Sequence, residues 1–224
     1  MIRRDYILRM LEEFFEFLSR LRSLKQGQLW NEAAGTLDQE LQRLIHTDAE
    51  AVASLSETEL LARLIQGEPT QVVRDKTWLL TTLLKEAGDV AAARERPEES
   101  RACYSKGLHL LLDTLATGEV TDFPEFVPRV EVFVTSLGET PLPLATQARL
   151  MQHYERTGEF GKAEDLLFAM LDSDAELGPL VDFGIAFYER LQRQGDASLT
   201  TGNLPRAELE TGLAELRRKG GRIH

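Results

Sequence analysis

The sequence predicts an all-α fold built from antiparallel helical hairpins, and three observations lead to this class. Apolar residues recur at three- and four-residue spacing in the long segments, which is the period of a helix with one buried face. No segment alternates apolar and polar residues over a useful length, as a half-buried strand does. A hairpin-like stretch at 154–167, YERTGEFGKAEDLL, has partial copies elsewhere in the chain. We therefore expect well over half helix and essentially no sheet.

The first 66 residues contain a long helical hairpin followed by two short helices. The first expected helix, 4–25, carries eight large apolar residues in a wide stripe at helical spacing. A second helix ends near residue 46. Thr47 with Glu50, and Ser56 with Glu59, have the Ser/Thr-x-x-Glu spacing of a capping box. These boxes predict short helices near 48–54 and 57–66.

The middle and end of the chain contain weaker boundary signals. Gly88 is expected to end the helix that carries the apolar residues of 72–84. The segment 124–137 is rich in β-branched residues, but Pro128 hampers a paired strand, so we expect a helix with a disturbed first turn. A polar loop is expected at 194–203, with Asn203 as the cap of the last helix. The other expected helices are 98–115, 176–193 and 204–219.

The stretch at 154–167 has the features of a tight helical hairpin. Tyr154 ends the apolar face of a first helix, and Gly158 permits the left-handed residue that closes it. Phe160 opens the second helix, and Ala163 is small enough for the two helices to approach closely. Leu167 continues the inner stripe at helical spacing. The pattern therefore predicts two antiparallel helices joined by a short turn.

The same spacing recurs with a small residue at Ala33, at Ala207 and, more weakly, at Ser100. With these residues the chain resembles the tetratricopeptide repeat family, which implies hairpins stacked as a right-handed α-solenoid. The small residues at 33, 100, 163 and 207 are unevenly spaced, so the repeats are irregular. MIRRDYILRMLEEF and SETELLARLI also resemble an uncharacterised bacterial family without assigned activity, which implies a bacterial cytoplasmic protein. We expect N-terminal hairpins over 1–140 and tetratricopeptide-like hairpins over 141–224.

Composition and motifs argue against several classes of function. The net charge is −11, whereas nucleic-acid binding requires a basic surface, and acidity disfavours anionic membranes. One cysteine, Cys103, suits a reducing cytoplasm and cannot start a zinc site. No nucleotide-binding glycine loop, His-Glu-x-x-His motif or nucleophile elbow occurs. We therefore expect no catalytic activity, no cofactor, no metal, no nucleic-acid partner and no membrane partner.

Two surfaces are candidates for binding. Stacked hairpins form a concave groove lined by each first helix, and Arg149, Gln152 and Arg156 are the groove candidates. These three residues also suit an ordinary polar helix face. The N-terminal stripe exceeds what one hairpin partner needs and suggests a homodimer interface. Its alternative role is to cover the short helices after residue 47. The interface candidates are Met10, Phe14, Phe15 and Leu18.

These expectations together indicate a non-enzymatic interaction module that binds a protein or peptide in its groove. A structural or regulatory homodimer without a free groove is the first alternative. A small-molecule sensor or an enzyme with a pocket between helices is the second. A fold does not fix a function. A binding module should leave the groove open to solvent, a homodimer should bury the groove or the N-terminal stripe, and a sensor or enzyme should have an enclosed pocket.

Overall fold

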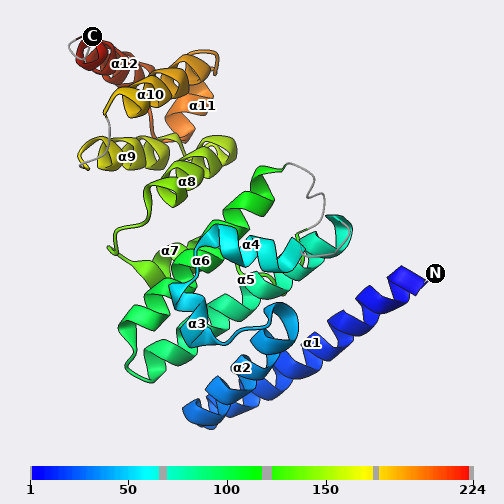
Figure 1. The fold of residues 1–224 in the computed structure, drawn as a ribbon. Coiled ribbons are helices and arrows are strands. Elements are labelled where there is room, and N and C mark those ends of the chain that lie inside the picture. Colours follow the sequence, from blue (N-terminus) through cyan, green and yellow to red (C-terminus); the bar gives the residue numbers. More distant parts are fainter. Residues whose placement is uncertain (1, 66–69, 118–122, 174–176, 222–224) are drawn as a thin grey trace. The chain divides into compact units, whose positions relative to one another are not determined.

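The structure is a computed structural model that describes residues 2–65, 70–117, 123–173 and 177–221. These residues form twelve helices and no strand, so the all-helical prediction is confirmed. The chain separates into two compact units, Met1–Pro141 and Leu142–His224. Figure 1 shows the helices of each unit, and the units are described one at a time below.

Unit 1, Met1–Pro141, is built around two long antiparallel hairpins, α1–α2 and α5–α6 (Figure 1). The short helices α3 and α4 connect the two hairpins, and α7 packs against α6. The bounds are α1 (Ile2–Gln26), α2 (Trp30–Ile45), α3 (Ala49–Ser54), α4 (Glu57–Ile65), α5 (Thr70–Ala93), α6 (Pro97–Ala116) and α7 (Val130–Leu137).

The α1–α2 hairpin closes because a short turn lets two apolar stripes meet. Gln28 adopts a left-handed conformation in this turn, with φ of 56°. Phe14 and Leu21 from α1 are buried in the same core cluster as Leu37 and Leu41 from α2. Burying such side chains is the main stabilising contribution to the hairpin, since each is worth about 1.5–3 kcal/mol when fully removed from water.

The two short helices begin with side-chain caps, one of which the sequence places correctly. At the start of α4, the Ser56 N–H donates to the Glu59 carboxylate at 2.7 Å, and the Glu59 N–H donates to Ser56 Oγ at 3.2 Å. This is the expected capping box. The box expected at Thr47 is wrong. Asp48 caps α3 instead, accepting the Ala51 N–H at 2.8 Å, because an aspartate at this position is at least as good a cap.

Gly88 does not end a helix, contrary to the sequence-based expectation. α5 continues past it to Ala93, and Gly88 lies against Tyr104 of α6. A Cβ atom at residue 88 would lie 2.5 Å from Cε1 of Tyr104 on α6. The Ser100 hydroxyl also donates to the Gly88 carbonyl at 2.9 Å. Gly88 therefore allows close helix packing.

The ambiguous segment before α7 is helical only in its second half. α7 starts at Val130, after the extended residue Arg129. The preceding residues from Phe123 form a turn in which the Val127 N–H donates to the Pro124 carbonyl at 3.1 Å. The expected helix with a disturbed start is thus confirmed, and the disturbed part is a separate turn.

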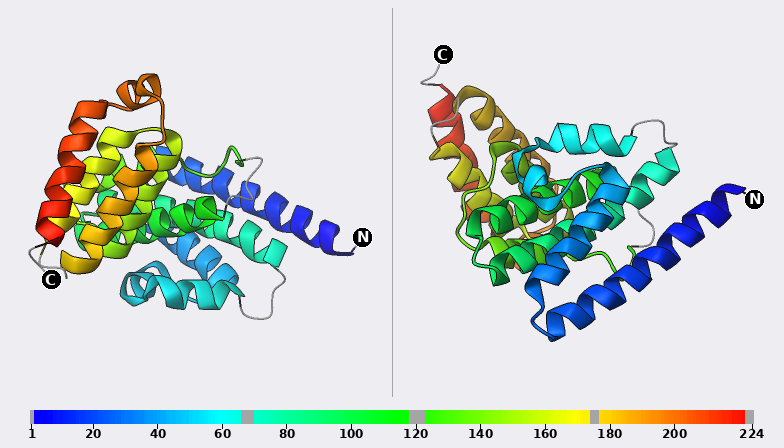
Figure 2. Two further views of the ribbon diagram at one scale, coloured as in Figure 1. Left: turned by 90° about the horizontal axis from the view of Figure 1, so that it is seen from above. Right: turned by 60° about the horizontal axis from the view of Figure 1, so that its bottom comes forward.

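Unit 2, Leu142–His224, contains the 154–167 hairpin, which forms as expected. Gly158 adopts φ of 81° and its N–H donates to the carbonyls at the end of α8. Phe160 starts α9, and Ala163 and Leu167 are fully buried. Figure 2 gives two further views of these helices. Their bounds are α8 (Leu144–Thr157), α9 (Phe160–Leu171), α10 (Leu177–Leu191), α11 (Asp196–Thr201) and α12 (Arg206–Gly220).

The C-terminal part of unit 2 departs from the expectation in three places. The expected loop at 194–203 contains the short helix α11, whose Thr200 and Thr201 hydroxyls bond back to carbonyls of the same turn. Asn203 does not cap α12. It takes a left-handed conformation with φ of 58°, and Pro205 occupies the cap position. Ala207 is exposed, so this copy of the pattern does not use its small residue for helix packing.

Candidate functional site

The four expected interface residues of α1 lie on two different stripes. Phe14 is fully buried and Met10 nearly so, and both belong to the core of unit 1. Phe15 is 48% exposed, and Leu18 is half-buried. Only Phe15 and Leu18 therefore lie where another molecule can contact them in the folded chain.

We call the two sets the core stripe and the open stripe of α1. The core stripe comprises Met10, Phe14, Phe17 and Leu21, all buried. The open stripe is displaced by one residue, about 100° around the helix, and also repeats at alternating three- and four-residue steps. Its apolar members are Leu8, Leu11, Phe15 and Leu18, and Arg22 and Lys25 continue it toward the end of the helix.

The open stripe forms one wall of a cleft of about 1060 Å³ in unit 1, which we call the α1–α5 cleft. The other walls come from the start of α2, from α5 and from the turn before α7. Its apolar lining consists of Phe15, Leu18, Trp30 and Phe126. Its polar lining consists of Ser19, Arg22, Lys25, Gln26, Thr82, Lys85, Glu86 and Glu125.

Phe126 fixes the aromatic part of this cleft. Its ring packs edge-on against Phe14, with ring centres 5.8 Å apart, and against Phe15, with ring centres 5.5 Å apart. Aromatic pairs prefer this edge-to-face geometry. The Thr82 hydroxyl donates to the Trp78 carbonyl within α5 at 3.0 Å and also lies 3.4 Å from the Phe126 carbonyl, so the turn contacts α5 at this point. The exposed Phe15 ring is therefore held in place within the cleft.

Four charged side chains form a charge network on the polar side of the cleft. The ammonium of Lys25 on α1 lies 2.5 Å from Glu86 and 2.6 Å from Asp89 of α5. The Lys85 ammonium lies 3.0 Å from Glu86 and 2.9 Å from Asp89. The Tyr104 hydroxyl donates to the remaining oxygen of Asp89 at 2.8 Å. Two cations thus share two carboxylates, and the network joins the end of α1 to α5.

Burial and pairing act in opposite directions on the pKa values of this network. Burial raises the pKa of Asp89, but hydrogen bonds from Lys25 and Lys85 outweigh burial and bring the pKa below its ordinary value. Burial lowers the pKa of Lys85, but Glu86 and Asp89 outweigh it and raise the pKa. Burial and the hydrogen bond to Asp89 raise the pKa of Tyr104. The Asp89 carboxylate therefore stays ionised and the Lys85 ammonium stays protonated at neutral pH, and the Tyr104 hydroxyl keeps its proton.

Two charged side chains of the cleft contrast with this network. Arg22 from α1 and Glu125 from the turn before α7 both line the cleft. Neither side chain makes a hydrogen bond or an ion pair with any residue that the structure describes. The cleft thus presents one cation and one anion that are available to a bound molecule.

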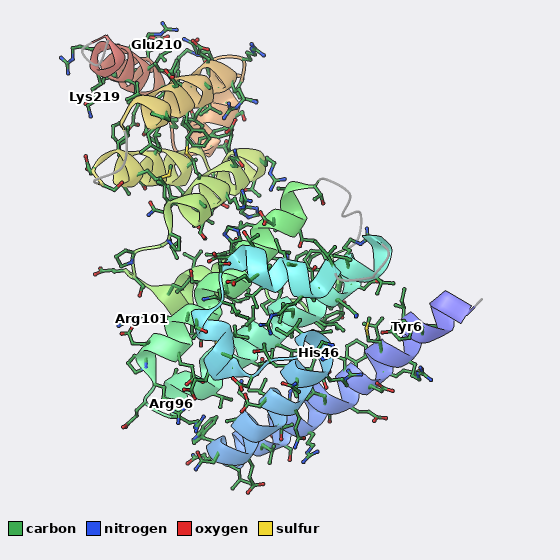
Figure 3. The ribbon with its side chains drawn as sticks, in the orientation of Figure 1. Tyr6, His46, Arg96, Arg101, Glu210 and Lys219 are labelled. Carbon is green, nitrogen blue, oxygen red and sulfur yellow. The ribbon has the colours of Figure 1, made fainter. Side chains whose placement is uncertain are left out.

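Two smaller cavities also lie in unit 1. One, of about 330 Å³, lies between α2, α3 and the end of α5. The other, of about 220 Å³, includes Tyr6, Arg9, Arg43 and Lys76. Figure 3 shows Tyr6 on the projecting N-terminal part of α1. Arg43 in this cavity is already paired with Glu13 and Glu40. Both cavities are less than a third of the volume of the α1–α5 cleft.

The expected groove residues lie together on one face of α8 in unit 2. Gln152 and Arg156 are exposed, whereas Arg149 is half-buried. The neighbouring Glu155 is held by Arg190 from α10 through two bonds of 2.6 and 2.7 Å. None of the three cavities described above includes the groove residues. Their role in binding a peptide stays a prediction.

Sequence reasoning missed most of the α1–α5 cleft. The network residues Lys85 and Asp89 stand four apart, a spacing that places them on one helix face. That spacing is common on solvated helices and does not single out a site. Phe126 comes from a turn, so no helical periodicity points to it. Only Phe15 and Leu18 were recognised in advance.

The structure adds three facts about chemistry and membranes. Cys103 is buried among apolar groups, which raises the pKa of its thiol to about 12. Within the described ranges, no group of three His, Cys, Asp or Glu side chains is placed to hold a metal ion. Among the same residues, no helix has both the length and the apolar character needed to cross a bilayer.

Comparisons with known proteins place the chain in a family. No curated protein and no solved structure matches the sequence. A family model, described as a family of unknown function, matches residues 1–221. The match is consistent with the uncharacterised family expected from the N-terminal third, and it extends through both units. The protein therefore belongs to the family of unknown function DUF6483.

Proposed function

We propose that this protein is a non-enzymatic protein-interaction module and that its α1–α5 cleft receives an amphipathic helix. The observation that carries the proposal is the open stripe of α1, whose apolar residues at helical spacing lead into the cleft. Helix-in-groove recognition uses anchors at such spacing on both partners. Phe15 and Leu18 are the anchors that this chain offers.

The size of the cleft supports a helical ligand. A helix about 10 Å wide with a pitch of about 5.4 Å occupies roughly 850 Å³ over two turns, taken as a cylinder. The cleft measures about 1060 Å³, so it accommodates two turns with some space for side chains. It is also slightly larger than the roughly 300–1,000 Å³ range of small-molecule pockets. A helix therefore suits it better than a small metabolite.

The charges of the cleft define the chemistry of the bound helix. The charge network neutralises itself, with Lys25 and Lys85 against Glu86 and Asp89. Arg22 and Glu125 are the remaining charged lining groups. A helix that carries an apolar stripe, a carboxylate for Arg22 and a cation for Glu125 satisfies all of them. Such a two-signed partner suits an acidic protein better than a nucleic acid does.

The proposal has a second part: the hairpins have a tetratricopeptide-like architecture, and α8 carries a groove that binds a peptide. The hairpin of α8 and α9 supports it, since its left-handed Gly158 and buried Ala163 suit a helix-pair repeat. The face of α8 with Gln152 and Arg156 is then a second candidate surface, for an acidic peptide. The single cysteine favours a reducing, cytoplasmic location, and the resemblance of the N-terminal third to an uncharacterised bacterial family implies a bacterial protein.

The proposed cleft is tested with a displayed library of helical peptides whose apolar positions are randomised. Peptides selected on the wild-type chain should bind with micromolar dissociation constants and change the emission of Trp30, which lines the cleft. Phe15→Glu should weaken them at least tenfold, because it places a charge against the bound apolar face.

Leu144→Glu is the matched control, because Leu144 is an exposed leucine on α8 in unit 2, outside the cleft. It should leave binding unchanged. Selected peptides that bind Phe15→Glu as tightly as the wild type would show that the cleft is not the binding site.

A further inference from the structure

We infer that the helix received by the α1–α5 cleft is α1 of a second copy of this chain, exchanged reciprocally. This inference rests on the proposed function and adds the identity of the partner. In a two-fold dimer, α1 of each copy would lie between α1 and α5 of the other. The two open stripes would then face each other, and the second copy would complete the cleft.

Exposed apolar side chains are concentrated on the α1–α2 hairpin. Among the described residues, seven large apolar side chains are strongly exposed, and four of them lie between residues 6 and 29. Tyr6 is 41% exposed and Leu8 is 49% exposed, in addition to Phe15. Leu8 and Phe15 stand seven residues apart, so they lie on the same face of α1, that of the open stripe. The helix that forms one wall of the cleft therefore also carries exposed apolar side chains on this face.

The length of α1 makes an exchange possible. α1 has 25 residues and α2 has 16, so α1 is the longer by nine residues, or about 13 Å. Figures 1 and 2 show its N-terminal part projecting beyond the rest of the hairpin. Tyr6 lies on this projecting part (Figure 3), and Leu8 follows it two residues later in α1. An extension of this kind can reach into the cleft of a second copy.

Antiparallel pairing of the two open stripes brings their apolar residues together. The stripe follows alternating three- and four-residue steps. In an antiparallel pair, a residue that precedes a three-residue step in one helix meets a residue that follows such a step in the other helix. Phe15 of one copy then meets Leu18 of the second copy, and the reverse contact follows from the two-fold symmetry. In the same alignment, Leu8 and Leu11 pack on the aliphatic stems of Lys25 and Arg22.

The charges of α1 complement the cleft in this alignment. Glu12, Glu13 and Glu16 form an acidic block, and Arg20 and Arg22 form a basic block further along the helix. Glu13 is already paired with Arg43 of its own chain, and Arg20 lies two residues after Leu18, on the side of α1 that points away from the open stripe. Antiparallel pairing of the open stripes therefore brings Glu12 of the second copy, which follows Leu11, beside Arg22. Like Arg22, the side chain of Glu12 makes no ion pair with the described residues of its own chain.

Light scattering coupled to size exclusion, over a range of protein concentrations, tests the exchange. The wild type and the control Leu144→Glu should be dimers at micromolar concentration. Phe15→Glu should raise the dimer dissociation constant at least a hundredfold, because two charges per dimer enter the apolar contact. Circular dichroism should show the same helix content as the wild type.

Reversing the charges of Arg22 and Glu12 tests the pairing of the two α1 helices without relying on an apolar substitution. Arg22→Glu should weaken the dimer at least tenfold, since it sets a second carboxylate against Glu12 of the other copy. The double variant Arg22→Glu with Glu12→Arg should restore it, because opposite charges meet again in both symmetric contacts. A role limited to folding of α1 would not produce this rescue.

Two results would overturn the inference. A wild-type chain that stays monomeric up to about 100 µM would exclude self-exchange at that concentration. A dimer that is unaffected by Phe15→Glu and by Arg22→Glu would have a different interface. In either case, Phe15-dependent binding of the selected peptides would still support the proposed function, so the two failures are distinguishable.

Discussion

Replacing Gly88 with alanine tests the packing that supports the charge network. An alanine in a helix interior is favoured over glycine by about 1 kcal/mol. At residue 88, however, its Cβ atom would lie 2.5–2.8 Å from three ring atoms of Tyr104. Tyr104 is buried and its hydroxyl is held by Asp89. The ring must therefore move, and the hydrogen bond that it donates must break.

The expected net effect is a loss of stability. Overpacking a core costs roughly 1–3 kcal/mol, and losing a hydrogen bond to a charged group costs about 1.5–3 kcal/mol. After subtraction of the helix-propensity gain, Gly88→Ala should destabilise unit 1 by about 1.5–5 kcal/mol. Both tryptophans, Trp30 and Trp78, lie in unit 1, so urea unfolding followed by tryptophan fluorescence reports this unit.

Gly35→Ala is the matched control for this experiment. Gly35 also lies inside a helix, α2, but a Cβ atom there meets nothing within 4 Å. This substitution should therefore stabilise unit 1 by about 0.5–1 kcal/mol. The substitutions Gly88→Ala and Gly35→Ala should change the free energy of unfolding in opposite directions. Equal stabilisation by both substitutions would refute the described contact between Gly88 and Tyr104.

Three further predictions concern titration and reactivity. Burial raises the pKa of Glu164, whose carboxylate accepts a hydrogen bond from the Tyr188 hydroxyl. The free energy of unfolding of the wild type should therefore fall as pH rises from the pKa of Glu164 in the unfolded chain through its higher pKa in the folded chain. Glu164→Gln should remove this loss in melts between pH 4 and 8. The pKa of Asp89 is lowered in the folded chain, so the free energy of unfolding should fall as pH falls from about 4 through the folded pKa of Asp89. Asp89→Asn should abolish this pH dependence in acid titrations followed by fluorescence. Cys103, with a pKa of about 12, should react with a disulfide reagent only in urea that unfolds unit 1, and rapid labelling of the native chain would contradict its burial.

Local signals were sufficient for the parts of the fold that depend on neighbouring residues. The 154–167 hairpin follows from Gly158 and Ala163, because a left-handed cap and a close helix contact both have specific residue requirements. The capping box of Ser56 and Glu59 was equally recognisable. In each case the residues that form the feature lie within a few positions of one another.

Features that depend on distant residues could not be found in this way. Gly88 suits both a helix end and a close helix crossing, and only Tyr104, sixteen residues further on, decides between them. The same applies to the charge network, in which Lys25 and Asp89 are 64 residues apart. Asp196–Thr201 contains threonines whose hydroxyls satisfy helical carbonyls, so a segment that resembles a loop forms a helix.

The stripe on α1 shows most clearly where sequence reasoning reached its limit. Periodicity established that α1 carries more apolar residues than one partner helix requires. It could not divide them into two sets, because Phe14 and Phe15 are adjacent and equally apolar. The division comes from the tertiary packing: Phe14 is buried in the core cluster that also contains Leu37 and Leu41 of α2, whereas Phe15 lines the cleft. One residue step around the helix thus separates a core contact from a contact that is available to a partner. The contrast between Phe14→Glu, which should unfold unit 1, and Phe15→Glu, which should leave it folded, isolates the binding role of the open stripe.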